Sequence, residues 1–469
     1  MSSLYLLPLA LSLLVDPQLA TVAAVPAAQV VEKDLAPSSR FAISPYVQDV
    51  QKDSAVIAFA TDAPSMALVH FDGPGGRGAV MSGPQQHHKV RLTGLSAGTR
   101  YRYTVAVRRQ GDLTGVESMS ESAEFATMAE GLPFLFLVYG DCRDRDSDHQ
   151  AVVRAMLKER PDFVLQTGDM VSRAGDVGQW RRYFAAVSPL IRSVPMYPAL
   201  GNHELRGDPD ASHFFRYFVI PGDRKRRPVY YAFRYGNSLF VSLDGNSPLD
   251  HDQSVWLERT LAEASQDRSI SHMFAFVHQP PYSVGAYCGS DRIQRRLVPI
   301  LRRYGVRAVF AGHEHAYQHL ERGGLRYFVT GGGGAPLYTR STSCNFEDDM
   351  ALRLFRAEHH YLRIQVDGDA ATLMAVSKDG EVMERVLLHE PVVPDSDYRV
   401  GPPVLSQSRV PPSPPVGASS PGQPSRTRPS APLFLLLTSA LAMVVGLLLL
   451  TAPRSRRRVD LMPDARRRS

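Results

Sequence analysis

The sequence predicts an α/β fold for the central part of the chain, because apolar strand-like runs alternate with helical patterns between residues 132 and 388. Shorter alternating segments between residues 42 and 128 predict a separate, smaller all-β unit. The length of 469 residues also exceeds that of one ordinary domain. We therefore expect two folded units, together with accessory segments at both ends.

The first unit, residues 42–128, has the pattern of a β-sandwich. Its clearest strand is 100–107 (RYRYTVAV), in which Tyr101 and Tyr103 alternate with charged and polar residues, as in a half-buried strand. Further strands are expected at 54–60, 67–71, 89–92 and 123–127, with Gly- and Pro-containing turns between them. No combination of residues in this unit indicates catalysis.

The second unit, residues 132–388, has the alternation of strands and helices that is typical of α/β domains. Strands are expected at 134–140, 163–168, 196–201, 230–235, 239–244, 273–278, 308–312, 325–330, 361–367 and 371–377. Helices are expected at 147–159, 178–190, 253–265 and 293–304.

Both ends carry membrane signals. Residues 1–28 resemble a secretory signal with a short apolar run but no positive n-region, so an uncleaved anchor or a misassigned start are the alternatives. Residues 389–432 predict an extended stalk, since 391–432 contains 12 Pro. Residues 433–451 predict a transmembrane helix rather than a buried core helix, and the Arg-rich tail 452–469 predicts a cytoplasmic end. We expect a membrane-anchored protein whose folded part lies outside the cytoplasm.

The charge distribution argues against nucleic-acid binding. The formal net charge is +6, and segment 452–469, with seven Arg and two Asp, carries five of those charges. The folded units are therefore nearly neutral and lack the basic surface that nucleic acid requires. Cys288 and Cys344 can pair in an oxidising compartment, which would leave Cys142 free.

Five predicted strands end in polar motifs. They read GDCR (140–143), TGDM (167–170), GNHE (201–204), VHQP (277–280) and AGHEH (311–315). Ligands of α/β sheets gather beyond the carboxyl ends of strands, so these motifs should converge. Taken singly, GD after a strand is usually a turn, and a His before Pro-Pro is usually structural. The joint pattern favours one site.

The residues of these motifs predict a metal centre. Two carboxylates, one amide and three imidazoles suit Fe, Mn or Zn better than Ca or Mg. Six donors are too many for one tetrahedral ion, but they suit two ions that share a bridging carboxylate, roughly 3.5–4 Å apart. The candidate ligands are Asp141, Asp169, Asn202, His278, His313 and His315.

The series GD…GD…GNHE…H…GHEH resembles the calcineurin-like metallophosphoesterase superfamily, and the preceding β unit makes the chain similar to its purple acid phosphatase branch. The resemblance implies a four-layer αββα sandwich. The β unit, with the segment LTGLSAGTRYRYTV, resembles a fibronectin type III module, in which the Tyr101 hydroxyl would bond back to the preceding turn.

The resemblance also implies roles for the site residues. Asp141 and His315 would bind the first metal ion, Asp169 would bridge, and Asn202, His278 and His313 would bind the second. A water between the ions would attack phosphorus, and His203 would protonate the leaving oxygen. The implied activity is that of an acid phosphatase on small phosphate esters. A phosphodiesterase or nucleotidase, or a non-catalytic membrane-anchored adhesion or receptor protein with a decayed domain, are the alternatives.

Two positions depart from the resemblance. The superfamily often has His two residues after the first Asp, where this chain has Arg143. Purple acid phosphatases instead supply a Tyr three residues after the second Asp, where this chain has Ser172. Waters, His149 or Asp146 could complete the first ion's shell. Arg143 either grips substrate phosphate, which would make it part of the catalytic site, or pairs with a nearby acid such as Asp144.

Two loops are expected near the site. Loop 222–231 (GDRKRRPVYY) is basic and either attracts anionic substrates or is simply solvated. Segment 330–336 (TGGGGAP) is not followed by Lys-Ser or Lys-Thr, so a nucleotide P-loop is not expected. We interpret the segment as a tight backbone passage beside the site.

Overall fold

The computed structural model of the chain describes residues 41–109, 119–131, 133–222 and 229–390. The expected signal (1–28), transmembrane helix (433–451) and basic tail (452–469) lie outside the described residues, as do most of the stalk (389–432) and of the basic loop. Within the described ranges, no helix has both the length and the apolar character needed to cross a bilayer.

The first unit is an antiparallel β structure, as the alternating sequence predicts. The strands run in the order β1-β2-β4-β5, and β3 pairs with β2. Their bounds are β1 Phe41–Gln48, β2 Ser54–Gly73, β3 Gly76–Thr93, β4 Arg100–Arg109 and β5 Met119–Ala126. Predicted strands 54–60 and 67–71 are parts of the single strand β2, whose pairing with β3 is irregular between Ala60 and Ala67.

Tyr101 makes the predicted contact with the turn before its strand. Its hydroxyl accepts a hydrogen bond from the backbone N–H of Ser96 at 2.9 Å, and its ring is fully buried. The contact fixes the turn that leads into β4. The fibronectin type III identity of the unit stays a prediction.

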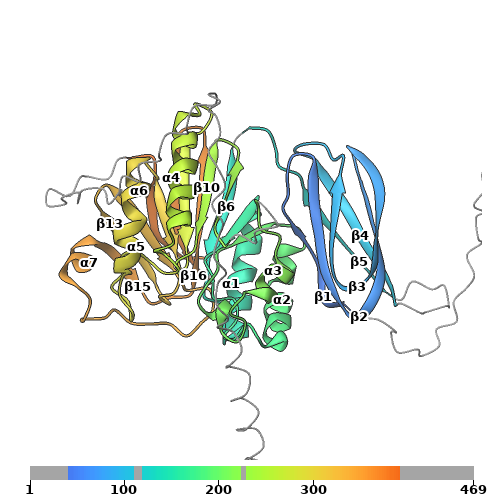
Figure 1. Cartoon of the computed structure of the whole chain (residues 1–469), viewed down its shortest axis with the longest axis horizontal. Coiled ribbons are helices and arrows are strands. Elements are labelled where there is room, and N and C mark those ends of the chain that lie inside the picture. The colour runs from blue at the N-terminus through green and yellow to red at the C-terminus, as the bar shows by residue number, and fades with distance from the viewer. Residues whose placement is uncertain (1–40, 110–118, 132, 223–228, 391–469) are drawn as a thin grey trace, which may run out of the picture. The chain divides into compact units, whose positions relative to one another are not determined.

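The second unit contains two sheets (Figure 1). The six-stranded sheet has the order β18 (Val382–Leu387), β17 (Ala370–Ser377), β16 (His360–Asp367), β6 (Phe134–Tyr139), β7 (Phe163–Gln166), β8 (Met196–Pro198). The seven-stranded sheet has the order β15 (Leu352–Arg356), β13 (Tyr317–Arg322), β14 (Leu325–Thr330), β12 (Ala308–Ala311), β11 (His272–Val277), β10 (Ser238–Leu243), β9 (Tyr231–Tyr235). All ten predicted strands are present, and β13, β15 and β18 are additional.

Aromatic side chains pack the two sheets against each other. The ring of Phe136 on β6 lies 5.0 Å from that of Phe240 on β10 and 5.6 Å from that of Phe274 on β11. Phe163 on β7 lies 5.1 Å from Phe240. Buried aromatic pairs of this kind add to the free energy of apolar burial and join the sheets into one core.

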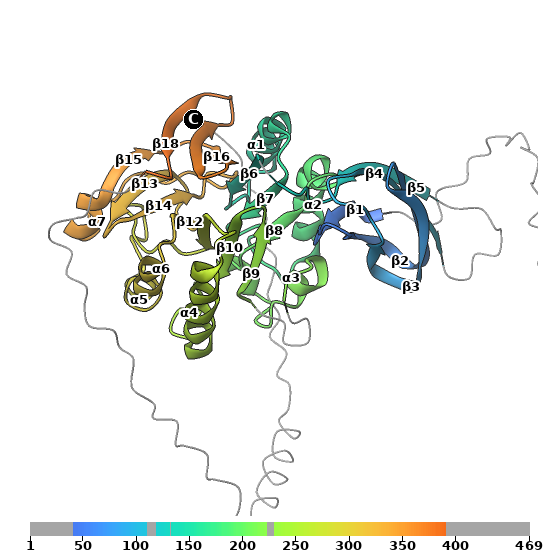
Figure 2. The same ribbon diagram turned by 90° about the horizontal axis from the view of Figure 1, so that it is seen from above.

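Helices cover the outer faces of the sheets, which gives the expected αββα layering. Helices α1 (Asp146–Glu159) and α2 (Val177–Ile191) share a core with the six-stranded sheet. Helices α4 (His251–Gln266), α5 (Asp291–Arg296) and α6 (Val298–Arg303) pack on the seven-stranded sheet, as Figure 2 shows. The short elements are η1 (His203–Leu205), α3 (Ser212–Tyr217) and α7 (Phe346–Ala351).

The prediction of one continuous helix at 293–304 is wrong. The segment 293–304 forms two helices, α5 and α6, which meet at Leu297. Pro299 lies in the first turn of α6. Proline has no N–H to donate and its ring clashes with the carbonyl four residues earlier, so one continuous helix is disfavoured there.

The parallel strands carry the polar motifs to a common edge. Strands β6, β7 and β8 pair in parallel, and so do β10, β11, β12 and β14. Within each sheet their carboxyl ends therefore lie at one edge, and contacts of His313 with Asp141 and of His278 with Thr167 bring the two edges together. Five of these strands end in the motifs that the sequence singles out.

Candidate metal centre

Three of the predicted ligands lie on left-handed backbone. Asp141, Asp169 and His313 have φ values of 57°, 58° and 69°, and each follows a glycine. Asp and His adopt this conformation more readily than most residues other than glycine. The backbone therefore turns sharply at each strand end and directs the ligand side chain into the site.

Two of the motif glycines are required by close packing. A Cβ atom on Gly312 would lie 2.3 Å from Oδ2 of Asp141. A Cβ on Gly201 would lie 2.4 Å from the backbone nitrogen of Asp169. Any side chain at these positions would displace a predicted ligand.

The predicted second-ion residues form a compact donor set. The candidate ligand atoms of Asp169, His278 and His313 all lie within 4.8 Å of one another. Nε2 of His278 is 3.2 Å from Oδ1 of Asp169 and 3.0 Å from Oδ1 of Asn202, and Nδ1 of His313 is 3.2 Å from Nε2 of His278. These residues fit one transition-metal ion.

Hydrogen bonding orients two of the imidazoles for binding. Nδ1 of His278 is 2.8 Å from the carbonyl of Thr167, and Nδ1 of His315 is 2.7 Å from the carbonyl of Pro336. A carbonyl only accepts, so Nδ1 carries a proton in both rings, and in the neutral ring Nε2 has the lone pair that binds a metal ion. Burial, with a contribution from His278, lowers the pKa of His313 to about 4, so that ring is neutral.

The predicted first-ion residues are also neighbours. Nε2 of His315 lies 3.6 Å from Oδ1 of Asp141, and Oδ2 of Asp141 accepts a hydrogen bond from the backbone of His313 at 2.8 Å. Oδ1 of Asp141 is buried and has no hydrogen-bond partner among the described residues. This oxygen therefore faces a position that suits a cation.

Arg143 reaches these first-ion residues. Its Nη2 is 3.3 Å from Nε2 of His315, and its Nε is 3.5 Å from Oδ2 of Asp169. Its Nη1 also donates to Asp144 at 2.5 Å. Both interpretations of Arg143 thus describe part of its environment, because the residue pairs with a nearby acid and also enters the site.

His203 lies beside the predicted bridging carboxylate. Its Nε2 is 3.6 Å from Oδ2 of Asp169, and its Nδ1 donates to the carbonyl of Ser172 at 2.8 Å. Burial lowers the pKa of His203, while the charge of Asp169 opposes that shift. The structure thus brings His203 and all six predicted ligands together, while their roles stay predictions.

Two suggested supplementary ligands are wrong. His149 lies on α1 with its ring stacked on Tyr183, 5.6 Å away, and burial lowers its pKa to about 3. Asp146 is exposed and lies 4.0 Å from Arg182. Both residues belong to α1, whose first turn directs His149 into the core and Asp146 toward solvent.

Sequence reasoning missed two buried glutamates, Glu204 and Glu314. Oε2 of Glu204 accepts hydrogen bonds from the backbone of Asp169 and Gly201, and its Oε1 accepts one from Met170. Glu314 accepts hydrogen bonds from the backbone N–H groups of residues 286 and 287. The available signal was the acidic residue inside GNHE and GHEH, next to a candidate site residue.

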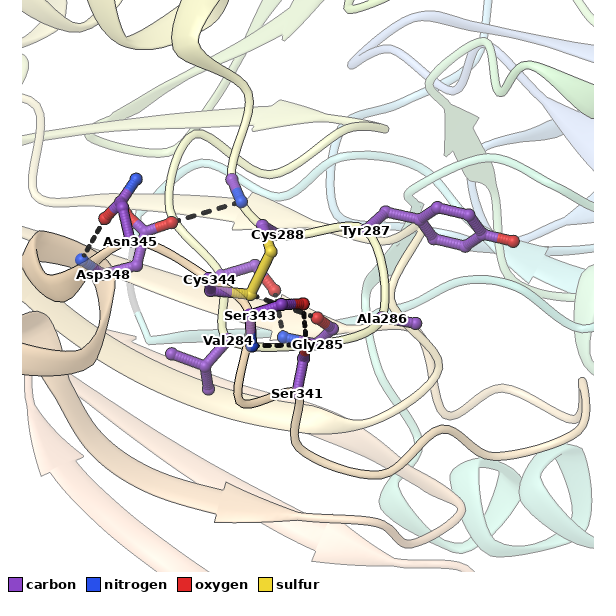
Figure 3. The surroundings of a disulfide bond; sticks show 12 residues. Val284, Gly285, Ala286, Tyr287, Cys288, Ser341, Ser343, Cys344, Asn345 and Asp348 are labelled. Carbon is purple, nitrogen blue, oxygen red and sulfur yellow. Dashed lines mark hydrogen bonds between the residues drawn. A yellow bond between two sulfur atoms is a disulfide. The ribbon is translucent and has the colours of Figure 1, made fainter.

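A disulfide anchors the loop that borders the second-ion set (Figure 3). Cys288 and Cys344 are bonded, as expected, and Cys142 is free and buried. Figure 3 shows Tyr287 extending away from the disulfide, and its ring lies 5.1 Å from that of His313. Tyr338 stacks on His315 with ring centres 4.0 Å apart. Two tyrosines that the sequence did not single out therefore line the imidazoles.

Segment 330–336 passes close to the site, as interpreted from the sequence. The backbone N–H of Gly333 donates to the carbonyl of Gly140, and that of Ala335 donates to the carbonyl of Asp141, at 2.9 and 2.8 Å. A Cβ on Gly333 would lie 2.3 Å from the carbonyl oxygen of Gly140. The glycine run is thus needed for backbone approach.

Comparisons with known proteins agree with this geometry. Residues 134–317 match the family model of the calcineurin-like phosphoesterases, so this part of the chain is a calcineurin-like phosphoesterase domain. Homologues of the chain include purple acid phosphatases. Purple acid phosphatase 13 of Arabidopsis thaliana is 26% identical over 303 residues, which cover 53% of this chain and 54% of that protein. Human tartrate-resistant acid phosphatase type 5 is 28% identical over 232 residues, covering 43% of this chain and 67% of that protein.

Solved structures share the fold. A purple acid phosphatase from yellow lupin seeds superposes with a TM-score of 0.61 at 17% identity, covering 73% of each chain. PhoD superposes with a TM-score of 0.55 at 14% identity, covering 72% of this chain and 86% of that one. The chain spans between 53% and 58% of the length of the three Arabidopsis purple acid phosphatases that it matches.

Proposed function

We propose that the domain hydrolyses phosphate esters with the help of bound transition metal. The observation that carries this proposal is the donor set of Asp169, His278 and His313, whose ligand atoms lie within 4.8 Å of one another beside Asn202. The similarity to purple acid phosphatases and the calcineurin-like phosphoesterase domain support the same class of reaction.

The chemistry is divided between metal and protein. A transition-metal ion, when bound, would supply Lewis acidity to the phosphoryl group and would lower the pKa of the water that attacks phosphorus. Asp169, Asn202, His278 and His313 would hold that ion. The remaining work, which is to orient the ester and to protonate the leaving oxygen, falls to Arg143 and His203.

His203 is the proposed general acid. Its Nδ1–H is held by the carbonyl of Ser172, so that Nε2 faces Asp169, one of the residues that would hold the ion. In its protonated form the ring carries a second N–H at Nε2. As the bond between phosphorus and the leaving oxygen breaks, Nε2–H would pass its proton to that oxygen and leave the neutral ring with Nδ1–H. Arg143 presents guanidinium N–H groups that suit phosphate oxygens. The two-ion arrangement implied by the resemblance stays a prediction for the pair Asp141 and His315.

We also propose that the domain works outside the cytoplasm, on a membrane-anchored chain. Support comes from the disulfide between Cys288 and Cys344, because such bonds persist in oxidising compartments. The signal, stalk and transmembrane helix expected from the sequence point the same way. The substrate would be a small phosphate ester.

The test is hydrolysis by the purified full-length chain of a panel of phosphate monoesters and diesters, with Mn, Fe and Zn compared. We expect release of inorganic phosphate from monoesters, and its loss together with metal in His278→Ala. A matched control is His251→Ala, an exposed histidine at the start of α4. A metal-loaded chain without activity on any ester would contradict the proposal, and activity confined to diesters would favour the phosphodiesterase alternative.

A further inference from the structure

The two departures from the expected ligand pattern are physically connected. Arg143 stands where the resemblance leads us to expect His, and Ser172 stands where it leads us to expect Tyr. In the structure the Ser172 hydroxyl donates to Oδ1 of Asp144, and Oδ2 of Asp144 accepts from Nη1 of Arg143 at 2.5 Å. The two positions where the resemblance leads us to expect a first-ion ligand are thus linked. Ser172 bonds to Asp144, and Asp144 holds the guanidinium of Arg143 in place.

That guanidinium contacts side-chain atoms that would otherwise bind the predicted first ion. Nε2 of His315 has a lone pair, because Nδ1 donates to the carbonyl of Pro336. Nη2 of Arg143, 3.3 Å away, donates to that lone pair. Nε of Arg143 faces Oδ2 of Asp169 at 3.5 Å, so the guanidinium also contacts the predicted bridging carboxylate.

Of the second-ion set, Asp169 is the member that Arg143 contacts, through the oxygen Oδ2, while His278 faces its other oxygen, Oδ1. The members of the set face one another, with 3.2 Å from His278 to both Asp169 and His313. Across the described ranges this is the single group of three or more His, Cys, Asp or Glu donors close enough to share an ion. Asp141 and His315 do not belong to this group of donors.

We propose that the chain binds a single transition-metal ion, at Asp169, Asn202, His278 and His313, and that the Arg143 guanidinium takes the position and charge of a second ion. A guanidinium beside Asp141 and Asp169 offsets their charge, and a second divalent cation at that position would be repelled by it. Its planar N–H groups also suit a phosphate oxygen, which a second ion would otherwise bind. The inference rests on the proposed function.

Metal content decides between one ion and two. The full-length chain is loaded with excess Zn²⁺ or Mn²⁺ and desalted. Its metal content is then measured by inductively coupled plasma mass spectrometry. We expect one ion per chain, and the same value in His315→Ala, because His315 binds Arg143 rather than metal. The double variant Arg143→His with Ser172→Tyr supplies both of the alternative first-ion ligands and should gain a second ion.

The matched control is Arg145→His, which changes a neighbouring arginine whose side chain is 56% exposed and lies 3.7 Å from Asp148. It should leave metal content at one ion. Arg143→Ala should keep the ion and raise KM for phosphate esters roughly 10- to 100-fold, the usual effect of losing a hydrogen bond to a charged group. A second ion gained by Arg145→His, or an unchanged KM in Arg143→Ala, would argue against the inference.

Two ions in the unaltered chain, falling to one in His315→Ala, would overturn the inference even if the double variant fails to fold. The outcome is separable from the proposed function. Two bound ions per chain, together with hydrolysis, would contradict the inference but not the proposed function. One ion without hydrolysis would sink the proposed function alone, and a chain that binds no metal would contradict both.

Discussion

Oε2 of Glu204 accepts a hydrogen bond from the backbone N–H of Asp169 at 2.8 Å. The residue that follows the predicted general acid therefore fixes the turn that carries the predicted bridging ligand. The same carboxylate accepts the N–H groups of Gly201 and Met170, both at 2.9 Å. One buried side chain thus ties the strand end after β7 to the strand end after β8.

Glu204→Gln should destabilise this junction. Three backbone N–H groups point at the carboxylate, so an amide must present its own NH₂ group to at least one of them. We expect the free energy of unfolding to fall by about 1–3 kcal/mol, and the affinity for metal to fall with it. Denaturant unfolding and metal titration measure the two effects. Glu263→Gln on the exposed face of α4 is the matched control.

His203→Ala should separate catalysis from metal binding. His203 contacts Asp169 at 3.6 Å, but it does not belong to the compact donor set. We expect kcat to fall by about 10²–10⁴-fold, the usual contribution of a general acid, while metal content stays unchanged. Undiminished turnover would refute the role assigned to His203, and His278→Ala should lose metal and activity together.

Removing the disulfide should affect both stability and substrate binding. Cys288 and Cys344 are 56 residues apart, so Cys288→Ser with Cys344→Ser should cost about 2–5 kcal/mol of unfolding free energy. Tyr287 adjoins the bond and contacts the ring of His313, so KM should rise more than kcat falls. Thermal unfolding and steady-state kinetics test this. A variant with unchanged stability and KM would show that hydrogen bonds, such as those to Glu314, hold the loop without the disulfide.

His319 should make stability depend on pH. Burial opposes a charge on His319, but contacts with Glu321 and Glu384 outweigh burial and raise its pKa above 6.5. Its Nδ1 lies 2.9 Å from Oε1 of Glu384. A raised pKa in the folded state means that this contribution is complete below pH 6.5 and is lost as pH rises through the folded-state pKa.

The measurement compares the unfolding midpoints of the unaltered chain and His319→Gln across neutral pH. The stability difference between them should be largest at low pH and should shrink as the pH rises. His251→Gln, an exposed histidine, controls for loss of a titrating group. A difference that stays constant from about pH 5.5 to about pH 9, on either side of the usual His pKa, would contradict the assignment.

Periodicity predicted most of the fold because buried strands between two layers leave near-continuous apolar runs. The strand that it missed in the middle of the domain, β13, contains buried polar residues. Gln318 is fully buried and bonds to Ser283 and to the backbone of Val284, and His319 is buried against Glu384. Such residues look like a loop until the partners from distant segments are known.

The candidate site was predictable in its composition but not in its contacts. Its ligands follow directly from strand ends, whose positions the apolar runs determine. The orientation of Arg143 depends instead on Ser172, which lies 28 residues after Asp144 in the chain. Glu204 and Glu314 act through backbone N–H groups, and these leave no trace in the pattern of side chains.

The left-handed backbone at Asp141, Asp169 and His313 also constrains how this site can change over evolutionary time. Only a few side chains tolerate that conformation cheaply, and Asp, Asn and His are among them. A mutation at Asp141 or Asp169 to a β-branched residue would lose a donor and strain the turn at once, whereas Asn would keep the turn. Few substitutions would therefore let a descendant chain lose its metal and keep its fold. The first of them would be an Asp to Asn change directly after the glycine.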